Sequence, residues 1–181
     1  FRYKNFDLSV FINGSYGNKV YNYLSMKLTH MNSPWTNQLN AVNGRAQLVP
    51  INPNKVYEDG TMWYNDVSNV MVANPGASIP RATINDPNDN DRISDRYIED
   101  GSYIRLKNIS LGYTFPKKTI DKLGLSNLRI YANIQNLLTI TGYDGYDPEI
   151  GASTSSVNVY GLDNGRYPSP TVYSFGLNVS F

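Results

Sequence analysis

The chain has 181 residues, the size of one domain or of part of a larger one, and its 16 Lys and Arg nearly balance 15 Asp and Glu. The resulting net charge of +1 provides no clustered positive field, so no nucleic-acid partner is expected. The lack of Cys excludes a disulfide framework and a thiolate metal site. A low charged fraction (17%) with 15 Tyr, 14 Gly and 10 Pro indicates a turn-rich all-β protein and excludes a helical bundle.

The hydropathy of the chain argues against a transmembrane helix, because its mean is −0.43 and no apolar run reaches about 18 residues. A transmembrane β-barrel stays open, since its alternating strands average to a near-neutral hydropathy. The chain starts without Met and without a signal peptide, already within a strand-like pattern. We therefore expect it to be a piece of a longer protein.

The N-terminal part predicts one strand followed by a very long connection. Within residues 1–20, the apolar residues Phe6, Leu8, Val10 and Ile12 alternate with mostly polar neighbours, as in a strand with two different faces. Residues 21–100 are rich in Asn, Pro, Asp and Gly, and are too long for a loop within a compact domain. We interpret them as an ordered extracellular loop region that packs on neighbouring loops and buries Trp35 and Trp63.

The C-terminal part predicts three further strands, at residues 101–116, 127–139 and 171–181. A short periplasmic turn at 117–126 joins the first two, and its Lys-rich sequence predicts one helical turn that ends at Gly124. A second long extracellular loop occupies residues 140–170. Short turns on one side and long loops on the other are typical of an outer-membrane barrel, so we predict antiparallel transmembrane strands.

Each strand alternates apolar with polar side chains, which predicts one face toward lipid and one toward the lumen. The residues expected to face lipid are Phe6, Leu8, Ile109, Leu111, Leu128, Ile130, Phe175 and Leu177. Those expected to face the lumen are Arg129, Tyr131, Gln135, Ser174 and Asn178. Along the closing strand we assign Tyr173, Phe175, Leu177, Val179 and Phe181 to the membrane-facing side that serves barrel assembly, with Phe181 at the periplasmic rim.

No motif in the sequence is an enzyme signature, and neither a cofactor nor a metal is predicted. His30 is the only His and sits in a polar loop, so we expect an exposed, non-catalytic side chain. The adjacent Glu99 and Asp100 point to opposite sides of an extended backbone. Residues 86–91 lack the Gly of a calcium-binding EF-hand at position six and its Glu at position twelve, which leaves only a looser calcium site open.

The loops contain aromatic residues beside Asn and Asp, a combination that can stack on sugar rings and bind their hydroxyls. We select Trp35, Trp63, Tyr64 and Tyr146 as candidate substrate-binding residues. Two other roles fit the same residues: they can pack the loops together or form an interfacial aromatic girdle.

Several motifs resemble the late-barrel signature of the SusC/RagA-type TonB-dependent outer-membrane transporters. They are SDRYIEDGSYIRLKNISLGY at 94–113, IYANIQNL at 130–137 followed by GYDPE at 145–149, and YPSPT at 167–171 before the aromatic last strand. FDLS at 6–9 and GSYGN at 14–18 also fit, so the resemblance covers nearly the whole chain. It identifies the chain as the C-terminal portion of a plugged barrel of on the order of 22 strands.

The resemblance also implies a function and partners. Such transporters import glycans or peptides together with a SusD-like surface lipoprotein and are energised through TonB. The last strand would be read by the barrel-assembly machinery, and the barrel would contact outer-membrane lipid. The plug and the TonB-contacting segment are not in this chain, so no energy-coupling residue is assigned.

Two other interpretations remain open at this point. A soluble β-sandwich that binds glycans shares the alternating strands and the loop aromatics, but it would need a second sheet to cover Tyr173, Phe175, Leu177 and Val179. A passive porin or adhesin barrel lacks the motifs quoted above. Dependence on detergent separates the barrel from the sandwich.

Overall fold

A computed structural model describes residues 1–31, 33–86, 88–150 and 160–181, and the chain divides into two compact units. One unit, which we term the sheet unit, consists of Phe1–Tyr21 and Ile98–Phe181. The other, termed the loop unit, is Asn22–Tyr97. In the described part of the chain, no helix has both the length and the apolar character to cross a membrane.

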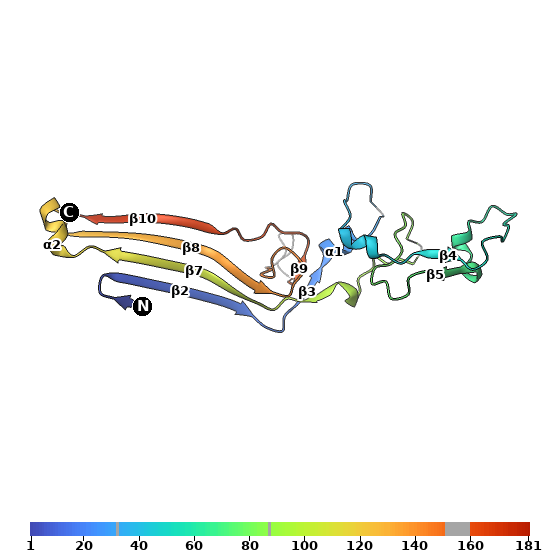
Figure 1. Ribbon diagram of the computed structural model, residues 1–181, viewed down its shortest axis with the longest axis horizontal. Coiled ribbons are helices and arrows are strands. Elements are labelled where there is room, and N and C mark those ends of the chain that lie inside the picture. The colour runs from blue at the N-terminus through green and yellow to red at the C-terminus, as the bar shows by residue number, and fades with distance from the viewer. Residues whose placement is uncertain (32, 87, 151–159) are drawn as a thin grey trace. The chain divides into compact units, whose positions relative to one another are not determined.

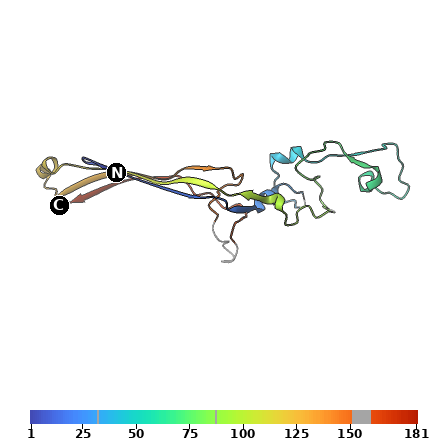
Figure 2. The same ribbon diagram turned by 90° about the horizontal axis from the view of Figure 1, so that it is seen from below.

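The sheet unit is built on a five-stranded antiparallel sheet with the order β1-β2-β7-β8-β10 (Figure 1). Its strands form a single layer, seen nearly edge-on in Figure 2. They are β1 (Arg2–Tyr3), β2 (Phe6–Ser15), β7 (Tyr103–Thr114), β8 (Asn127–Thr141) and β10 (Val172–Ser180).

The strand register places the predicted apolar and polar sets on opposite faces of this sheet. Leu8 pairs with Leu111, Leu111 with Ala132, and Ala132 with Phe175, so these residues share one face, since directly paired side chains point the same way. The same face carries Phe6, Ile109, Leu128, Ile130, Tyr173, Leu177 and Val179. The opposite face carries Asp7, Ser110, Arg129, Tyr131, Asn133, Gln135, Ser174 and Asn178. No second sheet is paired over the apolar face in the described part of the chain.

Two β-bulges keep this division of faces intact over strands longer than ten residues. The register of β7 against β2 shifts at Lys107, which has no partner opposite it. The register of β8 against β7 shifts near Asn136, whose φ of 52° lies in the left-handed region. Each extra residue shifts the two-residue alternation of faces by one position. Leu106 and Ile109 therefore both lie on the apolar face, although they are three residues apart.

A short helical turn joins β7 to β8. It comprises α2 (Lys117–Ile120) and the 3-10 turn η5 (Asp121–Leu123), and it ends at Gly124 with a left-handed φ of 69°. Ile120 anchors the turn, with only 2% of its surface exposed, while Lys117, Lys118 and Lys122 point to solvent.

A second, three-stranded sheet of very short strands follows the order β6-β3-β9. Its strands are β3 (Lys19–Asn22), β6 (Ile98–Asp100) and β9 (Leu162–Asp163). Val20 forms its centre and is 1% exposed. This sheet joins the start of the long connection to its end, because Lys19 pairs with Asp100.

The loop unit contains short elements and little apolar core. They are α1 (Tyr23–Leu28), the hairpin of β4 (Leu48–Pro50) and β5 (Val70–Val72), and the 3-10 turns η1 (Asn40–Gly44), η2 (Trp63–Asn65), η3 (Val67–Asn69) and η4 (Asp95–Tyr97). Among its described residues, the buried apolar side chains are Met26, Val42 and Tyr97. Polar side chains bonded to the backbone supply the remaining order: the Asn69 and Asn74 amides donate to the carbonyls of Asn52 and Arg45.

Two sequence-based expectations for the loop unit are wrong. Trp35 was expected to be buried and is 93% exposed, because the few apolar residues of this unit gather elsewhere; Trp63 is half-buried. His30 was expected to be exposed and is 7% exposed. Its Nε2 lies 2.8 Å from the Tyr97 hydroxyl and its Nδ1 4.0 Å from Asp86, so distant residues bury and satisfy the ring.

Candidate functional site: a polar pocket beside an ion-pair cluster

A polar pocket of about 660 Å³ lies at the end of the sheet unit where β2 and β3 meet β7. Its walls come from the ends of these strands and from the segments 148–150 and 160–169. The residues that line it are Ser15, Asn18, Lys19, Val20, Tyr103, Lys107, Pro148, Glu149, Ile150, Tyr160, Gly161, Arg166 and Ser169. Among the described residues, these bring basic, aromatic and amide side chains together in one hollow.

A cluster of ion pairs centred on Arg105 adjoins this pocket through the lining residues Lys107 and Glu149. Arg105 is 3% exposed and donates three hydrogen bonds: Nε to Thr139 Oγ1 (2.8 Å), Nη1 to Glu149 (2.7 Å) and Nη2 to Asp147 (2.5 Å). Lys107 Nζ donates to the other oxygen of Glu149. The planar guanidinium thereby connects two strands of the sheet to the segment 147–149.

Asp147 extends the cluster to the next loop. Its two oxygens accept hydrogen bonds from the backbone N–H groups of Glu149 (3.0 Å) and Ser169 (2.9 Å). Burial alone would raise the pKa of Asp147, but the Arg105 guanidinium and these two N–H groups outweigh it and hold the pKa below its ordinary value. Asp147 is therefore ionised at neutral pH and fixes the segment that leads into β10.

Arg105 and Lys107 are two residues apart in β7, so their side chains lie on one face of the strand and can reach the same carboxylate. Lys107 is the extra residue of β7 and has no partner on β2. Arg105 and Lys107 both bond Glu149, Arg105 through one oxygen and Lys107 through the other. The Lys107 ammonium also lines the pocket.

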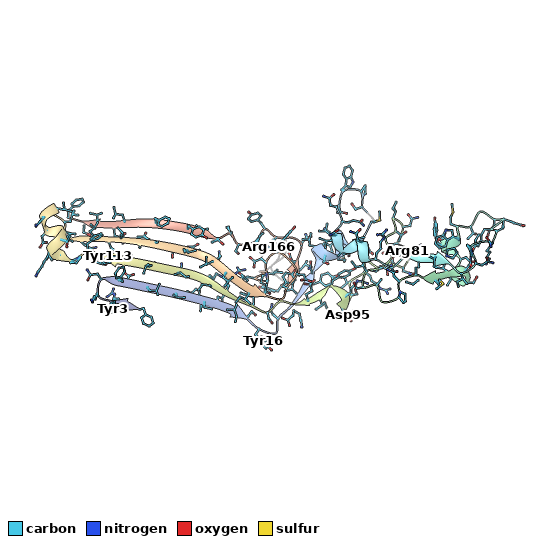
Figure 3. All side chains as sticks on the ribbon, in the orientation of Figure 1. Tyr3, Tyr16, Arg81, Asp95, Tyr113 and Arg166 are labelled. Atoms are coloured by element: carbon cyan, nitrogen blue, oxygen red, sulfur yellow. The ribbon has the colours of Figure 1, made fainter. Side chains whose placement is uncertain are left out.

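A second buried pair orders the segment that carries the pocket residue Arg166. The Tyr143 hydroxyl donates to Asp163 at 2.6 Å, and Asp163, 1% exposed, also accepts from the backbone N–H of Gly165 at 2.8 Å. Burial, reinforced by the Asp163 carboxylate, raises the pKa of Tyr143 far above its ordinary value, so its hydroxyl keeps its proton. This pair fixes the loop that carries Arg166, labelled in Figure 3.

The pocket also holds polar groups with unused bonding capacity. Lys19 pairs with Asp100 at 3.1 Å, and Ser102, through its hydroxyl and its backbone N–H, followed by Lys19, lowers the pKa of Asp100 to about 2. Arg166 forms no ion pair with any described residue. The Oδ1 atom of Asn18 is buried and finds no hydrogen-bond donor among the described residues, an arrangement that costs about 1–3 kcal/mol.

The sequence-predicted substrate residues lie outside this pocket. In the loop unit, the rings of Trp63 and Tyr64 meet edge to face at 5.7 Å, and the Arg81 guanidinium lies 5.7 Å from the Tyr64 ring. Trp35 makes no ring contact with a described residue. In the sheet unit, Tyr146 is 62% exposed, next to the cluster residue Asp147. Their role in binding stays a prediction.

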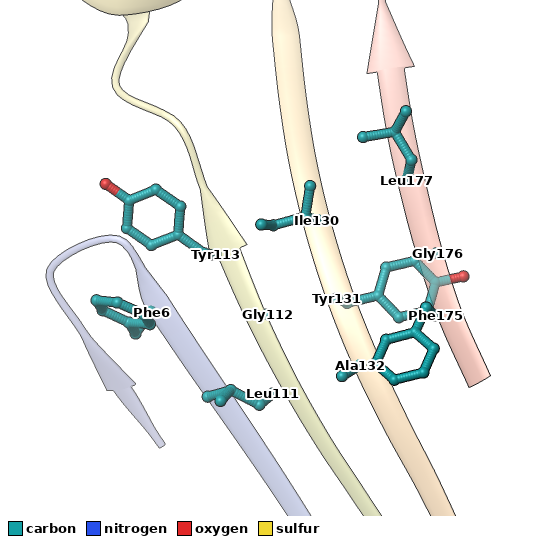
Figure 4. A pocket seen from close by; sticks show the side chains of 10 residues that line it. All are labelled: Phe6, Leu111, Gly112, Tyr113, Ile130, Tyr131, Ala132, Phe175, Gly176 and Leu177. Carbon is teal, nitrogen blue, oxygen red and sulfur yellow. The ribbon is translucent and has the colours of Figure 1, made fainter. Parts of the chain in front are cut away.

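The predicted membrane-facing residues of β10 are on one face and open to the surroundings. Phe175 is 83% exposed and Leu177 61%, and Phe181 follows β10 with 93% exposed. A shallow apolar hollow of about 560 Å³ lies between the side chains of this face (Figure 4). On the opposite face, Tyr131 occupies the space above Gly176, where a Cβ atom would clash with its ring.

The described residues contain no group of three or more His, Asp, Glu or Cys side chains that could hold a metal ion. In the loop considered for calcium, Asp86 uses its oxygens internally, accepting from the Asn90 amide and the Asp91 backbone N–H. Pro87 of this loop lies outside the described residues. So do residues 151–159 of the predicted loop 140–170.

The Arg105 cluster was not predicted from the sequence. A visible signal was present: Arg105 and Lys107 are basic residues inside a predicted transmembrane strand, where charged side chains are expensive unless they face the lumen and find partners. Their partners are 42 residues away, and local spacing carries no information on such a pairing.

Comparison with known proteins places these features in a family. No family model matches the chain. The TonB-dependent receptors P3 and P26 of Formosa agariphila are 35% and 32% identical to it, each over 99% of this chain. The TonB-dependent receptor SusC of Bacteroides thetaiotaomicron is 36% identical over 93 residues, or 50% of this chain and 8% of SusC. The chain belongs to the SusC/RagA-type TonB-dependent receptors.

Solved structures agree with this membership at the level of the fold. The RagAB peptide importer in its closed-closed state matches 99% of this chain with a TM-score of 0.64 at 19% identity, and the open-open state matches 98% with a TM-score of 0.61. The chain spans 15% of receptor P3, 16% of receptor P26 and 16% of the RagAB chain. Receptors of this type are outer-membrane β-barrel proteins, so the amphipathic sheet is a segment of a barrel wall and not half of a β-sandwich.

Proposed function

We propose that this chain forms part of the wall and outer loops of a TonB-dependent transporter that imports oligomeric nutrients, glycans or peptides, across the outer membrane. The observation that carries the proposal is the sheet with one continuous apolar face and one polar face. A barrel wall needs this division because lipid covers one side and a wet lumen the other. Relatives with 35% and 32% identity are TonB-dependent receptors.

The two faces support an assignment of roles. The apolar face, with Leu111, Ile130, Phe175 and Leu177, contacts outer-membrane lipid. The opposite face, with Arg105 and Arg129, lines the lumen. Asp7 accepts two hydrogen bonds from the Arg129 guanidinium, at 3.1 and 2.6 Å, so this charge is paired within the wall. By the same assignment, the polar pocket opens to the path of the solute.

The proposal includes partners for each region. A SusD-like surface lipoprotein covers the extracellular side, where the loop unit exposes apolar residues such as Trp35 and Val67. TonB acts through parts of the transporter outside this chain. The barrel-assembly machinery recognises the last strand through Tyr173, Phe175, Leu177, Val179 and Phe181. Trp35, Trp63, Tyr64 and Tyr146 contribute aromatic contacts to the solute, and no catalysis takes place.

Uptake by whole cells tests this function. Deleting the gene of the full-length transporter should abolish growth on one class of oligomer, glycan or peptide, while growth on its monomers continues. Complementation should restore growth only in cells that have TonB. Uptake that continues without TonB, or a full-length protein that stays monomeric in buffer without detergent, would contradict the proposal.

A further inference from the structure

The polar pocket carries more cationic hydrogen-bond donors than its own carboxylates use. Lys19, Lys107 and Arg166 line it, while Glu149 is the single carboxylate among its described lining residues. Each Lys ammonium has three donors, and the ion pairs of Lys19 and Lys107 in the described structure use one donor each. Arg166 adds a guanidinium that pairs with no described carboxylate.

The carboxylates at the pocket are already engaged. Glu149 receives Arg105 on one oxygen and Lys107 on the other, and Asp147 receives Arg105 together with two backbone N–H groups. Asp100 is held by Lys19, and Asp163 accepts hydrogen bonds from the Tyr143 hydroxyl and from the backbone N–H groups of Gly165 and Arg166. The Arg166 guanidinium is exposed at the pocket wall and forms an ion pair with none of these carboxylates.

The pocket also offers features that match a sugar residue. The Tyr160 ring is 75% exposed and presents an apolar face at the wall. Asn18 contributes an amide whose oxygen accepts no hydrogen bond from a described residue. A sugar hydroxyl both donates and accepts, so it can bridge an ammonium and an amide oxygen within one hollow.

We propose that this pocket binds the carboxylate of a uronic acid residue in an acidic oligosaccharide. Arg166 supplies a guanidinium whose fork matches a carboxylate, Lys19 and Lys107 supply further donors, and Tyr160 stacks on the sugar ring. An acidic peptide side chain carries no hydroxyl beside its carboxylate, so it uses the mixed donors and acceptors of this pocket less completely. The inference rests on the proposed function, because it takes the polar face as the path of the solute.

Binding to the purified full-length transporter tests the pocket directly. Isothermal titration compares trigalacturonate with a neutral trisaccharide for the wild type, Arg166→Gln and Lys19→Gln. We expect Arg166→Gln to lower the ratio of acidic to neutral affinity about tenfold, and Lys19→Gln to lower it less, because Lys19 already pairs with Asp100. Lys122→Gln in the turn between β7 and β8 is the matched control, since it removes an exposed cation far from the pocket lining. Heat-modifiable migration on gels confirms that each variant is a folded barrel.

Several results would overturn the proposal. They are an absence of trigalacturonate binding, an equal loss of both sugars in Arg166→Gln, or an equal effect of Lys122→Gln. Tighter binding of triglutamate than of trigalacturonate through Arg166 would assign the pocket to peptides and also overturn it.

The uptake assay and the titration together separate this inference from the proposed function. A wild type that imports an oligomer in a TonB-dependent way, but fails the titration test, disproves the pocket alone. A wild type that binds trigalacturonate through Arg166, but shows no TonB-dependent uptake, disproves the proposed function and retains the binding site.

Discussion

Different interactions stabilise the sheet unit and the loop unit, each within itself. In the sheet unit, backbone ladders join β2, β7, β8 and β10 over nine or more residues each, and most side chains on the apolar face remain exposed. In the loop unit the paired strands have three residues, and buried polar side chains such as His30, Asn69 and Asp86 supply much of the order.

This difference reflects the surroundings of each unit in the proposed transporter. A barrel wall is completed by lipid and by neighbouring strands, so its side chains need few partners within the segment. A loop region in water has no such cover, and its backbone groups must be satisfied by its own polar side chains. Substitutions should therefore lower stability in different ways: in the sheet unit through lost lipid contacts and strand pairing, and in the loop unit through lost side-chain hydrogen bonds.

The largest effect is expected at Arg105, a buried residue of the sheet unit that depends on side-chain pairing as the loop unit does. Arg105→Gln leaves the carboxylates of Asp147 and Glu149 without their guanidinium. Removing one partner of a buried ion pair costs about 3–5 kcal/mol. The segment 142–150 of the full-length transporter should then become sensitive to protease added outside the cell.

Acid should reproduce part of this effect. The pKa of Asp147 is lowered in the fold, so its contribution to stability is complete above the unfolded value of about 3.9 and is lost as the pH falls through the lower, folded value. Protease sensitivity of segment 142–150 should rise in that acidic range in the wild type and change little in Arg105→Gln. Equal protease resistance of segment 142–150 in Arg105→Gln and in the wild type would show that the cluster does not hold this segment.

A charge on the apolar face should have the next largest effect. Leu111 lies on the apolar face of β7, and Leu111→Arg should destabilise the inserted barrel by about 2–4 kcal/mol if it faces the bilayer centre. Urea unfolding of the full-length protein in lipid vesicles measures this. Ser110→Arg on the opposite face and Val67→Arg in the loop unit, where Val67 is 92% exposed, should each change stability much less. Equal losses at Leu111 and Ser110 would reverse or remove the assignment of faces.

Local periodicity explains what the sequence predicts well. Alternation at Leu8, Leu111, Ile130 and Phe175 encodes which face each side chain takes, because this property depends only on the two-residue period of a strand. The bulge at Lys107 breaks that period by one residue, and no separate turn residue marks it. The faces were therefore predictable, while the bulge was not.

Long-range polar pairs explain what the sequence does not predict. His30 meets Tyr97 across 67 residues, and Arg105 meets Asp147 across 42. A lone His in a polar segment is most often exposed, and nothing near position 30 indicates the hydroxyl that buries it. For Trp35 the error is of the opposite kind, since composition shows that aromatics are present but not whether the unit has enough core to cover them.

A medium effect is expected at this His30 contact. Tyr97→Phe removes the hydroxyl 2.8 Å from His30 Nε2 and leaves a buried ring nitrogen without that partner, at a cost of about 1–3 kcal/mol. Amide hydrogen exchange of residues 88–97 in the full-length transporter should become faster. Tyr64→Phe is the control, because its hydroxyl makes no hydrogen bond to a described residue. Similar exchange in both variants would mean that the His30 contact does not order this segment.

The smallest effect on stability is expected at Trp35. This substitution tests directly whether the loop unit has a core that covers its aromatic residues. Because its side chain is 93% exposed, Trp35→Ala should change the free energy of unfolding by less than about 0.5 kcal/mol, as surface substitutions do. If the ring stacks on the solute as proposed, the same variant should bind an oligosaccharide several-fold more weakly, since such aromatic contacts contribute about 0.5–1.5 kcal/mol. Thermal unfolding and titration of the full-length transporter measure the two effects separately. A stability loss of about 3–5 kcal/mol, typical of a buried Trp, would show instead that other loops of the complete barrel cover Trp35 and that the loop unit shares their core.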